Sequence, residues 1–237
     1  MAVAALGTIP SIFQKTDRAY QVVTPSSVPP TVFVPGGRFA VGAAWVEGRP
    51  VREAEVRPLR FGLTPVSNAA YAGFLAAFGA AEPPWWRDPE FSDPEQPVVG
   101  ITWIEAVEYC GWLHDTLGGR WRLPSEAEWE HAAAPAAADP DARPAAQRPT
   151  PLGRGTANGY GLLDMGSSVH EWCNDWFTPE PLQLARRYDP RGPETGECRV
   201  RRGGSWRSRA RTASWRDGFD PSARAADGGF RVVREVP

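Results

Sequence analysis

Glycine and proline restrict this chain more than any other feature of its sequence. It has 24 glycines and 25 prolines among 237 residues, and these two residue types interrupt helices and mark turns. We therefore predict few long helices and many loops. Hydrophobic residues make up 42% and charged residues 23% of the chain, which is typical of a globular protein with a real core.

The chain is expected to form one domain behind an N-terminal arm. Residues 1–30 end in a proline-rich run and are interpreted as the arm. Residues 31–237 show neither an internal repeat nor a second core pattern, so we predict a single domain there. Within it, residues 134–151 are rich in alanine, proline and aspartate without apolar periodicity. That composition indicates a low-complexity surface loop.

Three helices have clear sequence signals. The first is predicted to begin after Ser67 and to end at Gly79. Its apolar face has helical spacing and consists of Tyr71, Phe74, Leu75 and Phe78. The second and third begin with capping boxes, in which Thr102 and Ser125 are each followed three residues later by a glutamate. The buried face of the second helix is expected to carry Ala106, Val107, Cys110 and Leu113.

Strands are expected on both sides of the helical region. Residues 32–34 read as a short strand, 35–37 as a turn, and 38–41 as a second strand that returns beside the first. Residues 57–61 are another strand candidate. From 152 to 237 the chain is rich in glycine and aromatic residues without a helical period, so we predict short strands joined by long loops that carry function.

Charge and cysteine content exclude several classes of protein. The net charge of −2 argues against a general nucleic-acid binder, although seven arginines between positions 199 and 216 make a local basic patch. No apolar run approaches the roughly 20 residues of a membrane span, and we expect a cytoplasmic protein. The three cysteines have no metal-binding spacing, and the sequence leaves open a disulfide between any two of them.

The segment 202–231 is the strongest candidate for a site. It opens with Arg-Gly-Gly-Ser-Trp, ends with Gly-Phe-Arg, and holds tryptophans and arginines between. Such side chains bind anions and aromatic groups well. The alternative is that the arginines are solvated and the tryptophans complete a core.

The run 122–130, Arg-Leu-Pro-Ser-Glu-Ala-Glu-Trp-Glu, resembles a signature of formylglycine-generating enzymes and their sulfatase-modifying-factor relatives. Further segments resemble that family in the same order, at 34–39, 64–71, 97–103, 158–162, 171–176 and 202–206. The resemblance implies an α+β fold of the C-type-lectin type, which is irregular and rich in loops, with few short helices and short antiparallel strands.

The resemblance also implies metal sites, and this sequence departs from the redox ones. Formylglycine-generating enzymes hold copper with two cysteines, whose positions here fall near Ser208 and Ala213. Serine and alanine cannot replace thiolates as copper(I) ligands, so we do not expect a copper–cysteine site. An iron site is not indicated by His114, His131 and His170. Of these only His170, just before the Glu-Trp motif, is near the candidate site, and a structural role is favoured.

A structural calcium ion is the third implication of the resemblance. Its matching ligands are the side chains of Asp164 and Glu171 with the backbone carbonyls of Ser167 and Val169, all oxygen donors that calcium prefers. The family's usual Gly-Asn in this loop is Ser167-Ser168 here. The alternative is that Asp164 only caps a turn.

Two functions therefore remain after the sequence. One is a family member without the copper–cysteine site that binds a small anionic molecule or a peptide and that, if it is an enzyme, is a diverged metal- and oxygen-dependent oxidoreductase. The other is a non-catalytic binding module of the same fold that recognises a protein partner. Both would use the same groove, in which tryptophans form the walls and serine and arginines bind an anionic group. Its expected residues are Trp172, Trp206, Ser208, Arg209, Arg211, Trp215 and Arg216.

Overall fold

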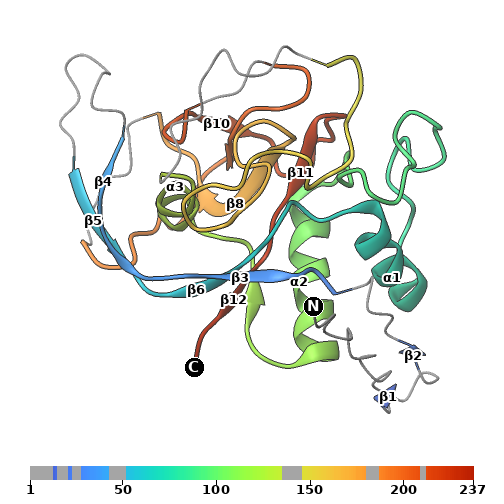
Figure 1. Ribbon diagram of the computed structural model, residues 1–237, viewed down its shortest axis with the longest axis horizontal. Helices are drawn as coiled ribbons and strands as arrows, with labels where there is room; N and C mark the ends of the chain where they lie inside the picture. The colour runs from blue at the N-terminus through green and yellow to red at the C-terminus, as the bar shows by residue number, and fades with distance from the viewer. Residues whose placement is uncertain are drawn as a thin grey trace, which may run out of the picture.

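The computed structural model describes residues 13–14, 21–22, 28–42, 52–134, 146–179, 187–208 and 212–237. Within these ranges, two four-stranded sheets and three helices form the body of the protein (Figure 1). This mixture of few helices and short strands confirms the predicted α+β class. The boundary expected at residue 30 stays a prediction.

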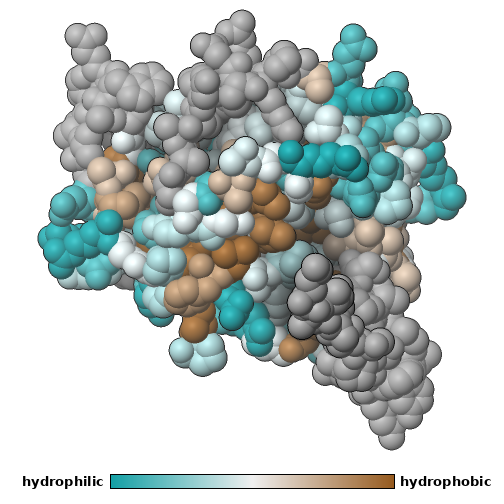
Figure 2. All heavy atoms as spheres, viewed as in Figure 1, coloured by the Kyte–Doolittle hydropathy of each residue, from teal (hydrophilic) through white to brown (hydrophobic). Residues whose placement is uncertain are grey.

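The first sheet has the strand order β3-β6-β12-β7, with every neighbouring pair antiparallel. Its strands are Thr31–Val34, Leu59–Gly62, Val233–Glu235 and Trp121–Arg122. Apolar side chains gather on the face over β3 and β6 (Figure 2), and Phe33 on β3 is half exposed. The predicted strand at 57–61 corresponds to β6 and begins two residues later.

The second sheet has the order β10-β9-β8-β11 and lies nearer to the candidate site. Its strands are Arg216–Phe219, Arg199–Arg202, His170–Trp176 and Gly228–Phe230. Strand β11 is parallel to β8, and the other pairs are antiparallel. Two further pairs complete the strands, β4 with β5 (Gly37–Val41 and Arg52–Val56) and β1 with β2 (Phe13–Gln14 and Gln21–Val22).

The hairpin predicted for residues 32–41 is wrong. Strand β3 pairs with β6, whereas β4 pairs with β5, so the chain passes from one sheet to another at residues 35–36. At this crossing Gly36 lies directly against the backbone of residue 56, since a Cβ atom at Gly36 would be 2.5 Å from the Val56 carbonyl oxygen. Strands β3 and β4, although adjacent in the sequence, therefore pair with different strands. The glycine at 36 allows the chain to pass close to the end of β5 between them.

The helices follow their sequence signals. Helix α1 (Asn68–Phe78) is capped by the Ser67 hydroxyl and ends at Gly79, whose φ of 64° suits glycine. Helices α2 (Trp103–Leu117) and α3 (Glu126–Ala133) both begin with complete capping boxes. One predicted core residue of α2 is wrong, because Val107 is 38% exposed. No helix in the described part of the chain is long and apolar enough to cross a membrane.

Aromatic side chains from α1, α2 and β11 form the main core. Tyr71 of α1 stacks on Tyr109 of α2 at 5.6 Å between ring centroids, and Phe230 of β11 meets Tyr109 edge-on at 5.3 Å. All three are almost fully buried. These contacts attach α1 and α2 to β11 of the second sheet. Because β11 pairs with the first residues of β8, they also position the start of β8.

A buried ion pair joins the two sheets. The Arg231 guanidinium and the Glu171 carboxylate are both fully buried and bonded twice, at 3.1 and 3.0 Å. Arg231 also donates to the carbonyl oxygens of Gly62, Leu63 and Leu163. One side chain therefore connects β8, the end of β6 and the loop at 163.

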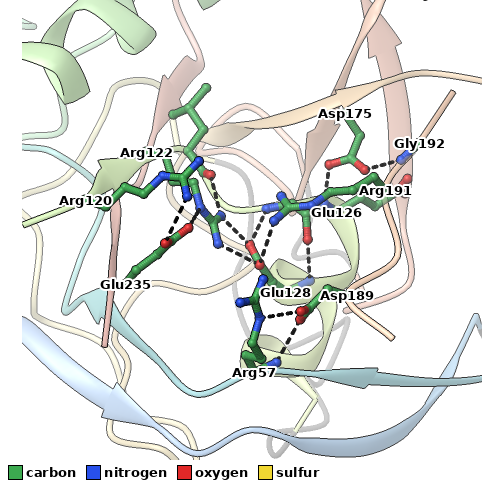
Figure 3. A network of polar contacts seen from close by, with 12 residues as sticks. Arg57, Arg120, Arg122, Glu126, Glu128, Asp175, Asp189, Arg191, Gly192 and Glu235 are labelled. Carbon is green, nitrogen blue, oxygen red and sulfur yellow. Dashed lines mark hydrogen bonds and ion pairs between the residues drawn. The ribbon is translucent and has the colours of Figure 1, made fainter. Parts of the chain in front are cut away.

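The acidic residues of the run 122–130 are also structural. Glu128 receives two hydrogen bonds from Arg122 and an ion pair from Arg191 at 3.5 Å (Figure 3). Burial opposes ionisation of Glu128, but the pair with Arg122 outweighs it and holds the pKa of that carboxyl below its ordinary value. Asp175 accepts from the amide of Glu126 at the start of α3. Burial and the nearby Glu126 carboxylate raise the pKa of Asp175 to about 6.

Glu171→Gln should destabilise the protein strongly, because it leaves the Arg231 charge buried without its partner. We expect a loss of about 3–5 kcal/mol in the free energy of unfolding, measured by urea denaturation. Glu82→Gln is the matched control, since its ion pair with Arg87 is largely exposed and exposed pairs contribute about 0–1 kcal/mol. Equal losses for the two variants would contradict a central role for the buried pair.

Candidate functional site

Gly203 fixes the path of the Gly-Gly-Ser-Trp segment after β9. Its φ is 77°, and a Cβ atom there would lie 3.1 Å from the Trp129 ring and 3.2 Å from Gly166. The following amides pair with the loop before β8, from Gly204 to the Gly166 oxygen at 2.9 Å and from Trp206 to the Ser168 oxygen at 2.8 Å. Glycine at 203 thus lets the segment lie against this loop.

Beyond this crossing, the chain forms a turn held by two serines. The Ser208 hydroxyl accepts from the Ser205 amide at 2.9 Å, and the Ser208 amide donates back to the Ser205 oxygen at 3.0 Å. Ser205 itself is buried and donates its hydroxyl to Asp227 at 2.8 Å. Asp227 directly precedes β11, so the turn is tied to the last strand of the second sheet.

His170 begins β8 next to this turn. Its Nδ1 lies 2.8 Å from the Gly203 oxygen, and because a carbonyl only accepts, Nδ1 carries the hydrogen. The other nitrogen, Nε2, lies 3.9 Å from the Asp227 carboxylate. The imidazole also stacks on Trp215 at 4.9 Å. We refer to His170, Ser205, Ser208, Trp215 and Asp227 together as the rim.

The imidazole of the rim is neutral near pH 7. Burial lowers the pKa of His170 and the nearby Arg201 guanidinium adds to this, while the Gly203 carbonyl and the Asp227 carboxylate oppose it. With Nδ1 protonated, Nε2 keeps its lone pair. The rim therefore offers a base and hydrogen-bond acceptor beside a carboxylate.

Two of the three tryptophans expected to wall a groove are in the core. Trp172 is 1% exposed and donates its indole N–H to the Ile101 oxygen, and Trp206 is 6% exposed and donates to the Ala226 oxygen. Strand alternation turns Trp172 toward the helices, and the turn at 205–208 folds Trp206 inward. Of the three, only the half-buried Trp215 belongs to the rim.

Of the three arginines expected in the groove, the one that the structure describes has a structural role. Arg216 donates two hydrogen bonds to Glu126 and one to the Thr178 oxygen, so it anchors β10 to α3. Arg209 and Arg211 lie outside the described residues. Arg207, which lies in the candidate segment but not among the expected groove residues, is exposed, with its guanidinium 4.9 Å from the Trp206 ring centroid.

Sequence reasoning also missed Ser205 and Asp227 as members of the site. Ser205 stands inside the Gly-Gly-Ser-Trp motif, and Asp227 lies two residues before the Gly-Phe-Arg motif at the end of the segment. Their positions in or near these motifs were thus the only available signal. Their hydrogen bond joins residues 22 positions apart, which no local pattern reveals.

The residues expected to hold calcium do not fit an ion as they lie. Both oxygens of Glu171 face the Arg231 guanidinium, and one also accepts from the Trp129 indole. A calcium ion would have to displace or adjoin that positive charge. Asp164 accepts from the Gly153 amide at 2.6 Å, while Ser167 is half-buried and Val169 buried. In the described ranges no three His, Cys, Asp or Glu side chains form a metal-binding group.

None of the three cysteines belongs to the rim, and all are free. Cys110 is on α2 and Cys173 on β8; both are buried, and burial raises the pKa of both thiols. Cys198 is half-buried next to β9. The two positions matching the copper cysteines are Ser208, on the rim, and Ala213, whose carbonyl oxygen accepts from Arg202. Their donor set does not fit copper(I).

The model of the sulfatase-modifying factor enzyme 1-like domain matches residues 18–236. The chain belongs to this family. It is 30% identical to the formylglycine-generating enzyme of Streptomyces coelicolor, with 90% of this chain and 91% of that protein covered. It is 29% identical to the hercynine oxygenase of Mycolicibacterium smegmatis, over 74% of this chain and 54% of that protein.

Solved structures agree with the fold of the sulfatase-modifying-factor family. PvdO from Pseudomonas aeruginosa has a TM-score of 0.75 and 23% identity, with 97% of this chain and all of that chain covered. At this identity the likeness concerns the fold alone. It confirms the C-type-lectin-like architecture expected from the resemblance.

Lowering the pH below about 6.5, the ordinary pKa of histidine, should destabilise the protein through His170. Because the folded-state pKa is lowered, the unfolded chain binds the proton more readily in this window, and stability falls as pH falls. His170→Gln should lose less stability over the same pH range in urea denaturation. An imidazole titration by NMR with a midpoint above 6.5 would contradict the prediction.

Proposed function

We propose that the rim binds a small anionic molecule or a short peptide, and that it does so without copper–cysteine chemistry. The observation that carries this proposal is the cluster of His170, Ser208, Trp215 and Asp227 at the place where the family's copper cysteines are expected. The cluster offers hydrogen-bonding groups and an aromatic ring but no thiolate. Such a set suits recognition of a polar ligand.

The rim would select its ligand by offering both hydrogen-bond donors and hydrogen-bond acceptors. Ser208 can donate a hydrogen bond, and the exposed Arg207 beside it supplies positive charge. His170 Nε2 and Asp227 instead accept hydrogen bonds from N–H or O–H groups of a ligand. Trp215, already stacked on His170, offers an indole to an apolar or planar part. A ligand that carries a carboxylate next to an amide or amine matches these groups.

A diverged oxidoreductase is the second candidate. Two observations favour it: the relatives include a formylglycine-generating enzyme and a hercynine oxygenase, and His170 is a neutral imidazole 3.9 Å from a carboxylate. Imidazole and carboxylate are two of the ligand types found at non-haem iron sites. A third ligand would have to come from the substrate, from water or from residues outside the described ranges.

Metal content separates these candidates. We expect the purified protein, incubated with iron(II) or copper(I) and then desalted, to retain neither metal in stoichiometric amount by elemental analysis. The reason is that the rim offers one imidazole and one carboxylate and no soft ligand. Stoichiometric iron lost in His170→Gln would instead establish the oxidoreductase candidate.

Ligand binding is tested at Ser208. In NMR titrations with citrate and with trialanine, we expect at least one of them to shift the Trp215 indole and His170 imidazole signals. Ser208→Leu should abolish that shift, because the larger side chain covers the polar turn. Ser222→Leu, at an exposed residue whose hydrogen bonds go to Asp220 and not to the rim, should leave it unchanged. No shift with either probe would contradict the proposal.

A further inference from the structure

A cavity lies between α2, β7 and β8, and no part of the proposed function uses it. Its volume is about 430 Å³, within the range of small-molecule sites. Strand β7 runs back beside α2 after the turn at 118–120 (Figure 1). The cavity is lined by Val107, Cys110, Gly111, His114, Arg120, Trp121, Arg122, Leu123 and Asn174.

Gly111 lies on the exposed face of α2, among the residues that line this cavity. It stands inside α2, where glycine is about 1 kcal/mol less favourable than alanine. Neither packing nor backbone requires it: a Cβ atom would meet nothing within 4 Å, and the φ is helical. The missing side chain therefore leaves open space beside the exposed Val107 and next to the buried Cys110.

Asn174 supplies a polar side chain to the lining of the cavity. The alternation of β8 directs Asn174 toward α2, on the side opposite to Cys173 and Asp175. Its side-chain amide makes no hydrogen bond in the described part of the chain, although its backbone is bonded to Pro124 and Arg199. The amide is thus available to a ligand that reaches this part of the cavity.

Two arginines, Arg120 and Arg122, supply positive charge to the lining of the cavity. Arg122 is engaged by Glu128 and Glu235 and is largely buried. The Arg120 side chain is 75% exposed, and its only ion pair among the described residues is a long contact of 3.4 Å with Glu235. It can therefore turn to an anionic group at the mouth of the cavity without breaking a strong bond.

From these observations we propose that the cavity between α2 and β7 binds a small amphipathic anion. An aromatic or branched aliphatic body would fill the space over Gly111 and Cys110. Its anionic group, a carboxylate or sulfonate, would meet Arg120, and a hydrogen-bonding group would meet Asn174. The site is independent of the rim, so either proposal can fail without the other.

Two fluorescent probes test the proposal on the full chain. Anilinonaphthalene sulfonate has an apolar body and an anion, and phenylnaphthylamine has a similar body without the charge. We expect both probes to bind with one-to-one stoichiometry. Gly111→Leu should abolish the binding of both and leave the melting temperature unchanged or higher, because leucine fills the space and favours the helix. Asp115→Leu, which adds leucine to the same helix at a residue that does not line the cavity, should not weaken binding.

The charge at the mouth is tested separately. Arg120→Gln should weaken the sulfonate probe by about threefold or more, as expected for loss of a partly exposed charge contact, and leave the neutral probe unchanged. Arg154→Gln is the matched control, because Arg154 is similarly exposed and also lies 3.4 Å from a glutamate. Absence of binding to the unmodified protein, or full binding to Gly111→Leu, would overturn the site. An equal effect of Arg120→Gln on both probes would overturn the anionic ligand.

Discussion

The pair between Arg231 and Glu171 is the interaction on which the rest of the structure depends. Both side chains are fully buried, and the arginine bonds to backbone in two further parts of the chain. Burying such charges is costly unless nearly every donor is satisfied. The short strands have few backbone bonds of their own, so this cross-linked centre holds the loops together. The rim begins at His170, directly beside Glu171.

Charged residues elsewhere in the fold act in the same way. Arg202 is buried between Glu126 and Glu130, and Arg216 reaches Glu126 from the adjacent strand. These bonds fasten α3 beneath the second sheet, on both sides of the turn that carries Ser208. The conspicuous run 122–130 therefore serves the scaffold, while the ligand-binding candidates lie on the turn that it supports. Arginines with such partners are not available to a ligand.

Local patterns predicted the helices well and the site only in part. Capping boxes at Thr102 and Ser125 act over three residues, so their geometry is written in the sequence. The hairpin at 32–41 failed because strand partners are chosen by contacts far along the chain. Trp172 and Trp206 were expected in a groove and are buried. An amphipathic residue type alone cannot say which way its side chain points.

The sequence by itself determined the family, the α+β class, the helix boundaries and the lack of cysteine at the copper positions. These depend on residue identity and short-range bonding. Only the tertiary structure decided which arginines are engaged, that Ser205 and Asp227 meet beside His170, and that Gly111 lies beside a cavity. The physical reason is that burial and ion pairing join residues distant in the chain, such as Arg120 and Glu235, which no local pattern specifies.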